Sequence, residues 1–186
     1  MAMPQPATDW TVERLDAIPD DGQRREIIDG ELFVNPPPSF RHQRLLMELA
    51  IRLTSYAREQ SVGLVLPLAV DIRYSRTTNV QPDLVVYPYI DGRAPREKPE
   101  PQALLLAVEV LSPRTARVDR GKKRRLYQRE GLREYWIVDL DAQVIERWRP
   151  SDERPEIMDG TLAWRPEGAV LPLELDLREL FASVLD

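Results

Sequence analysis

The sequence predicts an α/β domain in which a helix, three strands, a second helix and a fourth strand form the core. Three observations predict it. A stretch after Ser39 has helical apolar spacing, three Val-, Leu- and Ile-rich runs follow it, and a basic helix then precedes another apolar run. Helical and strand patterns in alternation are typical of α/β proteins.

Length and composition limit the class of protein. The 186 residues fit one domain, which we expect to span residues 1–186 with its core at about 39–139. The absence of cysteine excludes disulfides, Cys-ligated metals and thiol nucleophiles. Residues 1–8 lack the pattern of a signal peptide, and the apolar runs are too short to cross a bilayer, so we expect a cytoplasmic protein.

The first elements follow from turn and capping residues. Asp29-Gly30 lies between two apolar runs in Glu26–Val34 and predicts a type I′ hairpin over about residues 24–35. Ser39 is a suitable N-cap for a helix that reaches about Gln60 and turns one apolar face inward. This face comprises Leu45, Leu46, Leu49, Leu53 and Tyr56.

The later elements are read from apolar runs. Strands are predicted at Leu64–Ile72, Gln81–Tyr87 and Ala103–Leu111, a helix from Thr115 or Asp119 to Glu130, and further strands at Glu134–Asp139 and Val144–Arg149. Gly131 supplies the stop of the second helix. Leu171–Phe181 mixes apolar and acidic residues and shows neither a clear helical nor a clear strand pattern.

Charge is unevenly distributed along the chain. The net charge is -5, but the segment Arg114–Arg133 holds nine basic residues against two acids and is +7, which leaves -12 elsewhere. The simplest interpretation is a solvated helix face, and the sharper one is a surface that contacts phosphates.

Two carboxylates interrupt the apolar strands. Glu109 stands inside a run that is otherwise apolar on both faces, and Asp83 begins the run that follows Pro82. A buried carboxylate is costly unless it is neutral, paired or bound to a cation. If the two strands are neighbours, a divalent cation between the acids is one solution, and oxygen ligands suit Mg²⁺ or Mn²⁺. A pair of salt-bridged structural acids is the other.

Lysine is rare in this chain, which has it only at positions 98, 122 and 123 while 23 other basic residues are arginine. Lys123 lies four residues after Asp119 and four before Tyr127, so a continuous helix would place all three on its inner face. The ammonium is then either a functional point charge or half of an ordinary helix pair with Asp119.

These residues resemble the Uma2 family, also called DUF820, of the PD-(D/E)XK nuclease-like superfamily. The resemblance rests on Gln81-Pro-Asp-Leu-Val-Val86, Val108-Glu-Val-Leu-Ser-Pro113, the helix with Asp119, Lys123 and Tyr127, and Gly131-Leu-Arg-Glu-Tyr-Trp-Ile-Val-Asp139. It implies a restriction-endonuclease-like core around a mixed central sheet, with an N-terminal β-hairpin and extra C-terminal strands.

The resemblance also implies roles for single residues. Asp83 and Glu109 are expected to be catalytic and to hold the metal. The motif lysine is missing at Leu111, so Lys123 of the following helix is the expected third catalytic residue. Matching family positions put further residues at the periphery of the site, namely Glu26, His42, Asp119 and Tyr127. His42 is equally compatible with a hydrogen-bonded core histidine, and Glu26 with a hairpin residue satisfied by an arginine.

The predicted function is a metal-dependent endonuclease that hydrolyses phosphodiester bonds in nucleic acid, with DNA as the expected partner and Mg²⁺ or Mn²⁺ as cofactor. Arg120 and Arg124 are the expected phosphate contacts, and cutting both strands of a duplex would need a homodimer. The alternatives are a nuclease-fold protein that binds nucleic acid or a protein without cutting, and a hydrolase of small phosphorylated molecules. No P-loop, zinc motif or serine-hydrolase elbow occurs.

Overall fold

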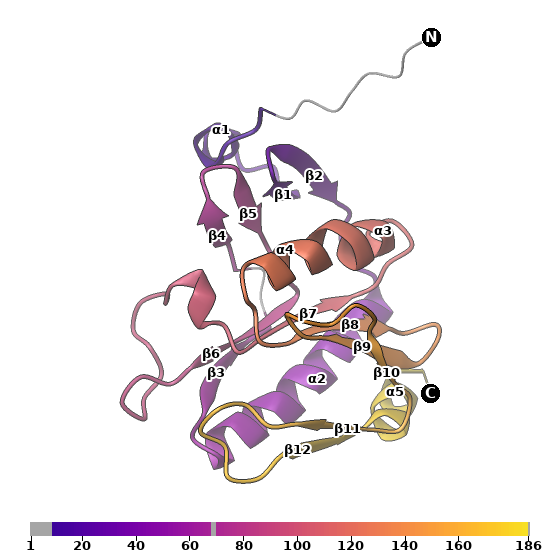
Figure 1. The fold of residues 1–186 in the computed structure, drawn as a ribbon. Helices are drawn as coiled ribbons and strands as arrows, with labels where there is room; N and C mark the ends of the chain where they lie inside the picture. Colours follow the sequence, from indigo (N-terminus) through magenta and orange to yellow (C-terminus); the bar gives the residue numbers. More distant parts are fainter. Residues whose placement is uncertain (1–8, 68–69, 186) are drawn as a thin grey trace.

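A six-stranded sheet forms the centre of the computed structural model, which describes residues 9–67 and 70–185 (Figure 1). Its strands lie in the order β10-β9-β8-β7-β6-β3. Their bounds, in chain order, are β3 (Gly63–Leu66), β6 (Leu84–Pro88), β7 (Leu106–Val110), β8 (Tyr135–Asp139), β9 (Val144–Trp148) and β10 (Glu156–Met158).

The sheet is mixed, as predicted. β7 and β8 pair in parallel, and the other neighbouring strands pair antiparallel. The parallel pair requires a crossover, and the helical segment between Ala116 and Arg129 makes it. The long helix α2 (Phe40–Glu59), the strands β3, β6 and β7, this helical crossover and β8 reproduce the predicted core order.

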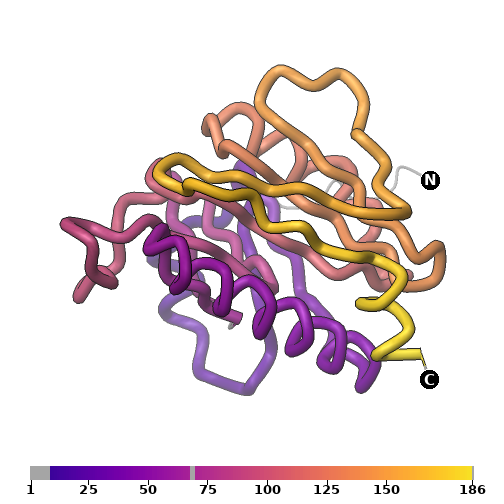
Figure 2. The backbone as a smooth tube through the Cα atoms, turned by 90° about the horizontal axis from the view of Figure 1, so that it is seen from below, coloured from indigo at the N-terminus to yellow at the C-terminus, as the bar shows by residue number. Residues whose placement is uncertain are grey.

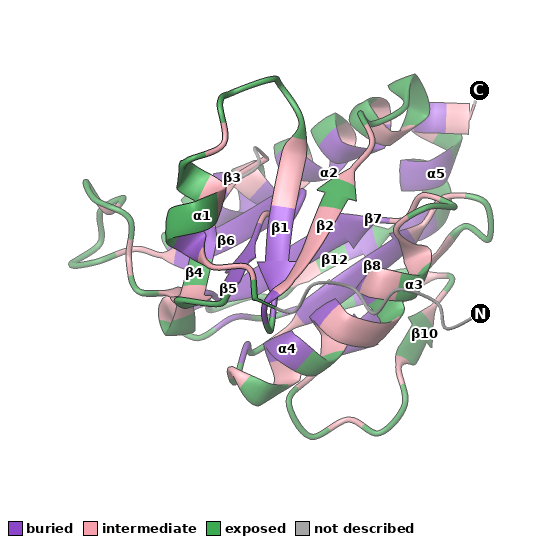
Figure 3. Ribbon diagram, turned by 90° about the horizontal axis from the view of Figure 1, so that it is seen from above, coloured by how far each residue is buried: buried purple, intermediate pink, exposed green. Residues whose placement is uncertain are grey.

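Different layers cover the two faces of the sheet. α2, the hairpin of β11 (Thr161–Trp164) and β12 (Leu173–Asp176), and α5 (Leu177–Leu185) lie on one face (Figures 1 and 2). The helical crossover and a small N-terminal sheet lie on the other (Figure 3). Each face has its own apolar cluster, so β7 is buried along its whole length and its one carboxylate, Glu109, is enclosed with it.

The N-terminal sheet places the hairpin above the central sheet. It has the strand order β2-β1-β5-β4 and contains β1 (Arg24–Ile28), β2 (Glu31–Asn35), β4 (Ile72–Ser75) and β5 (Thr78–Val80). Asp29 and Gly30 have φ values of 50° and 80°, which a type I′ turn requires. The predicted hairpin is confirmed. The short helix α1 (Val12–Asp16), capped by Thr11, precedes it.

One predicted strand is wrong. The run Leu64–Ile72 is not continuous: β3 ends at Leu66, before Pro67, and Ile72 begins β4 of the other sheet. Proline has no N–H to donate to a strand ladder, so the chain leaves the sheet there. Part of the predicted strand, residues 68–69, lies outside the described residues. The segment Pro101–Ala103 forms the short 3₁₀ helix η1, so β7 starts later than Ala103.

The predicted second helix is interrupted by a different helical geometry. α3 (Ala116–Val118) and α4 (Arg124–Arg129) flank η2 (Asp119–Lys123), a π-helical turn. Gly131, with φ 73°, ends the segment as expected. Apolar spacing does not predict a π turn, which recurs at functional sites. Ser39 caps α2, as predicted, and Gln60 ends it. The C-terminal run Leu171–Phe181 divides between β12 and α5.

No helix within residues 9–67 and 70–185 is long and apolar enough to cross a membrane.

Candidate active site

Asp83 and Glu109 lie close together where two neighbouring strands, β6 and β7, pair. Asp83 directly precedes β6, and its backbone N–H donates to the Val108 carbonyl at 3.1 Å. Its carboxylate Oδ2 accepts from the Val110 N–H at 2.9 Å. Asp83 therefore contacts the residues on both sides of Glu109. The predicted adjacency of the two acids is confirmed, whereas a shared metal ion stays a prediction.

The Asp83 carboxylate is held in its charged form. Arg24 Nη1 donates to Oδ1 at 2.9 Å, and His42 Nε2 lies 3.3 Å from Oδ2. Burial alone would raise the pKa of Asp83, but His42, Arg24 and the Val110 N–H lower it to about 2. An ionised oxygen donor therefore stands at this position over the whole physiological pH range.

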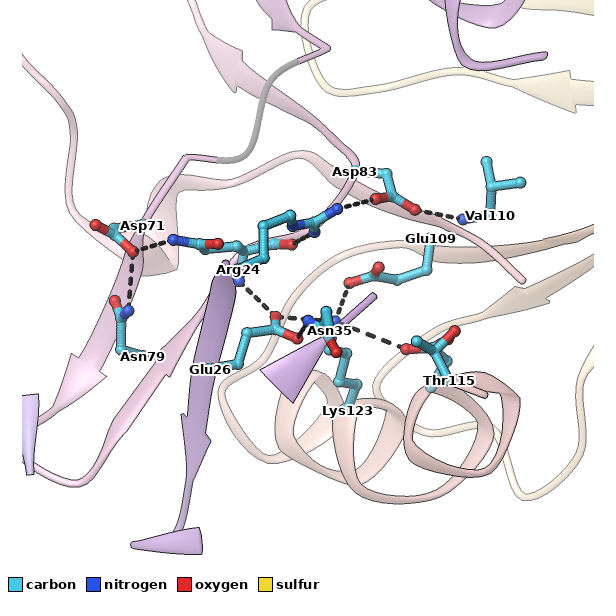
Figure 4. A network of polar contacts seen from close by, with 12 residues as sticks. Arg24, Glu26, Asn35, Asp71, Asn79, Asp83, Glu109, Val110, Thr115 and Lys123 are labelled. Atoms are coloured by element: carbon cyan, nitrogen blue, oxygen red, sulfur yellow. Dashed lines mark hydrogen bonds and ion pairs between the residues drawn. The ribbon is translucent and has the colours of Figure 1, made fainter. Parts of the chain in front are cut away.

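Lys123 is buried among three carboxylates. Its Nζ lies 2.8 Å from Glu109 Oε1, 2.9 Å from Glu26 Oε1 and 3.6 Å from Asp119 Oδ1, and its side chain is only 3% exposed (Figure 4). Burial alone would lower the pKa of the ammonium, but the three carboxylates raise it above its usual value. The helix pair with Asp119 is present, but it is buried, and Lys123 also contacts Glu26 and Glu109, which lie far from it in the sequence.

The pKa of Glu109 is shifted in the opposite direction from that of Asp83. Burial raises the pKa of this carboxyl well above its usual value, Lys123 opposes that rise, and the negative charges of Asp83, Asp119 and Glu26 add to it. Burial likewise raises the pKa of Asp119. Four buried carboxylates thus surround two permanent cations, Arg24 and Lys123. This excess of negative charge favours an added cation.

Glu26 anchors the hairpin to the site. Its Oε1 also accepts from the Gln81 N–H at 2.6 Å, and its Oε2 accepts from Asn35 Nδ2 at 2.5 Å. It is satisfied by Lys123 and by amide donors rather than by an arginine. β1, β2 and the segment before β6 are therefore linked through one carboxylate (Figure 4).

A cavity of about 580 Å³ opens onto these groups. Asp83, Glu109, Asp119 and Lys123 line it, together with His42. The loop with Pro36–Pro38 and the loop with Ser112–Thr115 form part of its wall. The charged residues are thus accessible to a ligand despite their low exposure.

A divalent cation fits this donor set. Mg²⁺ is commonly held by one or two carboxylates while water and substrate phosphates complete its coordination, and Asp83 and Glu109 supply such carboxylates. Asp119 lines the cavity, and its buried Oδ2 has no hydrogen-bond partner in the described part of the chain. Within that part, no group of three or more His, Asp or Glu side chains is arranged so that it could hold a metal ion, so protein ligands beyond the two carboxylates are not in place.

The structure brings most of the predicted site residues together. Asp83, Glu109, Lys123, His42 and Asp119 line one cavity, and Glu26 lies directly behind Lys123. Tyr127 does not line the cavity. It is buried behind it, and its ring packs 4.7 Å from that of Tyr135.

The two predicted phosphate contacts differ in where they lie, and their phosphate role stays a prediction. Arg124 is absent from the cavity lining: its guanidinium lies 4.8 Å from the Trp148 ring centroid and donates to Gln128 at 2.8 Å. Arg120 lines the cavity but is bound to Glu146 at 2.6 Å and Asp139 at 2.8 Å. The helix arginines were assigned by their sequence position, which does not reveal such intramolecular partners.

Arg24 is the main site residue that the sequence did not indicate. It precedes Glu26 by two residues in β1, so both side chains point to the same side of the strand. Its Nη2 also donates to the Gln81 carbonyl at 2.5 Å. The available signal was the alternation of side chains along a strand: in the predicted hairpin, a residue two positions from Glu26 points to the same side as Glu26.

A mixed sheet whose neighbouring strands present an Asp after a proline and a Glu, beside a buried lysine, defines a nuclease-like protein of the PD-(D/E)XK class. The chain belongs to the Uma2 family, whose model matches residues 12–184 and is described as "Putative restriction endonuclease".

A crystal structure with the same fold comes from Anabaena variabilis and is described as a putative nuclease belonging to DUF820. It is 24% identical in sequence, covers 95% of this chain and 99% of its own, and superposes with a TM-score of 0.77. The likeness shows the restriction-endonuclease-like fold. No curated protein matches the chain.

Proposed function

We propose that the protein is a metal-dependent endonuclease that hydrolyses phosphodiester bonds in nucleic acid, with DNA as its substrate. The observation that carries the proposal is the convergence of Asp83, Glu109 and the Lys123 ammonium on one cavity. Membership of a family described as restriction endonucleases supports the same reaction.

Asp83 and Glu109 would hold Mg²⁺ or Mn²⁺. When bound, such an ion supplies Lewis acidity toward a phosphate oxygen and lowers the pKa of a bound water. Arg24 and the Val110 N–H fix the orientation of the Asp83 carboxylate, and each of its oxygens keeps a further lone pair for an ion.

Lys123 would place a fixed positive charge beside the reacting phosphate. Because Glu26 and Asp119 hold its ammonium on two sides, it cannot swing away from Glu109. In this position it can orient a water molecule or stabilise the negative charge that grows on the phosphate oxygens. Lys123 on the helix would thereby replace the strand lysine that Leu111 cannot provide.

A non-cutting protein of the same fold is the second candidate. It is favoured by the engagement of both Asp83 oxygens and because, among the described residues, no group of three or more His, Asp or Glu side chains could hold a metal ion. Such a protein would bind nucleic acid or a protein partner through the same cavity. A homodimer belongs to the endonuclease proposal for the case in which both strands of a duplex are cut.

The test is a cleavage panel. Supercoiled plasmid, linear duplex, single-stranded DNA, RNA and small phosphodiesters are incubated with Mg²⁺, Mn²⁺, Ca²⁺ or EDTA. We expect a nucleic-acid product with Mg²⁺ or Mn²⁺ that is absent with EDTA and in Asp83→Asn. Binding in Ca²⁺ without cleavage under any condition would instead establish the non-cutting protein. Turnover confined to the small phosphodiesters would contradict both.

A further inference from the structure

Five cationic side chains line the active-site cavity, but they differ in whether they are free to bind an anion. Arg24 is bound to Asp83, Lys123 to Glu109 and its neighbours, and Arg120 to Asp139 and Glu146. Arg41 and Arg114 have no carboxylate partner within the described residues, and both are exposed. A phosphate can reach these two without first breaking an ion pair.

Arg114 stands on an ordered loop. The Ser112 and Thr115 hydroxyls lie 3.1 Å apart, and the Thr115 N–H donates to Ser112 Oγ at 3.2 Å. These hydrogen bonds fix the backbone on both sides of Arg114, directly after the strand that carries Glu109. Arg41 comes from a different element, the first turn of α2, one residue before His42.

A second hollow of about 460 Å³ begins at Arg114. It shares five lining residues with the active-site cavity: Asn35, Pro36, Pro37, Arg114 and Thr115. Its remaining wall consists of Gln23, Phe33, Val34 and Val118. The surface therefore continues from the carboxylates, past Arg114, into a recess with an aromatic ring and apolar side chains.

The chemistry of this recess suits an unpaired base. Phe33 supplies an aromatic ring, which has the Lys122 ammonium 5.3 Å from its centroid, and Val34, 52% exposed, is a further apolar residue of the wall. Bases stack on aromatic side chains without regard to sequence, provided that they are not stacked within a duplex. Gln23, Asn35 and Thr115 are the uncharged polar residues of the wall, and their side chains carry groups that can hydrogen-bond a base edge.

We propose that the second hollow binds the nucleotide next to the scissile phosphate, with its base against Phe33 and its phosphate on Arg114, while Arg41 holds a phosphate on the other side. This assignment rests on the proposed function. It makes the preferred substrate single-stranded or locally unpaired nucleic acid. Arg114 and Arg41 take over the role that sequence analysis gave to Arg120 and Arg124.

The test measures binding separately from cleavage. Fluorescence anisotropy with a labelled oligothymidylate is recorded in EDTA for the wild type, Arg114→Gln, Arg41→Gln and Phe33→Leu. Arg124→Gln is the matched control, because its side chain stacks on Trp148 away from both hollows. Phe33→Leu keeps an apolar side chain in β2, and thermal melting checks that each variant is folded.

We expect each of the three variants to weaken binding by about tenfold and Arg124→Gln to change it less than twofold. The arginine variants should also lower the slope of log affinity against log salt by about 0.7 each. An abasic strand of equal length should bind the wild type and Phe33→Leu with equal affinity, since it has no base that could stack on the side chain of residue 33.

Wild-type affinity in Arg114→Gln and Phe33→Leu, or a preference for fully paired duplex, would overturn the subsite. If the subsite is overturned in this way but Mg²⁺-dependent cleavage is still observed, the proposed function stays intact. Conversely, the expected binding losses without any cleavage would support the subsite and contradict the nuclease.

Discussion

The most informative perturbation is the removal of the Lys123 charge. Its side chain is 3% exposed and contacts three buried carboxylates, so Lys123→Met removes the cation while keeping most of the volume. Breaking a buried ion pair from one side costs about 3–5 kcal/mol. In a domain of this size about 1 kcal/mol lowers Tm by about 2–4 °C, so a fall of about 6–20 °C is expected.

The loss of stability should depend on pH. Without the ammonium, the pKa of Glu109, already above its ordinary 4.5, rises further in the folded state. A carboxyl whose pKa is higher folded than unfolded favours folding below the unfolded pKa, and this contribution is lost as the pH rises through the folded pKa. Lys123→Met should therefore be closer to the wild type in acid than at neutral pH.

Added metal separates the structural from the catalytic role. If Asp83 and Glu109 bind Mg²⁺, the ion replaces part of the missing charge, so millimolar Mg²⁺ should raise the Tm of Lys123→Met more than that of the wild type. Single-turnover cleavage with Mg²⁺ should still be about 10²–10³ times slower, as for other lost electrostatic groups.

The matched control is Lys122→Met. Lys122 is 39% exposed, paired with Glu31 and 5.3 Å from the Phe33 ring centroid, so its loss should cost less than about 1 kcal/mol and slow cleavage far less than the loss of Lys123 does. A Lys123→Met protein with wild-type Tm would refute the buried-charge reasoning. One with a wild-type rate would remove Lys123 from the mechanism.

Three further predictions follow from the same contacts. Glu109→Gln should stop cleavage and abolish the Mg²⁺-dependent thermal shift, and an unchanged shift by scanning calorimetry would exclude Glu109 as a ligand. Arg24→Gln should lower the free energy of unfolding, measured with urea, by about 2 kcal/mol, because it leaves the buried Asp83 carboxylate without the Arg24 cation. Gly131→Ala should lower the free energy of unfolding by about 1–2 kcal/mol, because an L residue is strained at a φ of 73°. No atom crowds the new Cβ, so the backbone strain is the whole effect and cleavage should not change. Equal stability of Gly131→Ala and wild type would contradict that strain.

The sequence alone determined the elements whose cause is local. Asp29-Gly30 specified the hairpin turn, Ser39 the start of α2, and the uniformly apolar run around Glu109 a central strand. The two strand carboxylates were visible because a charge inside an apolar run contradicts its surroundings. The same reasoning failed at Leu64–Ile72, where composition suggested one strand and Pro67 divides it between two sheets.

Only the tertiary structure decided which charged groups are neutralised and which remain available. Lys123 is part of a buried cluster because the hairpin brings Glu26 to it across nearly 100 residues of sequence, and Arg24 reaches Asp83 by the same route. Arg120 and Arg124 are engaged by partners on β8, β9 and their own helix, which no spacing along the chain reveals. Burial and pairing are properties of distances in space, so the sequence identified the carboxylates while the fold selected their partners.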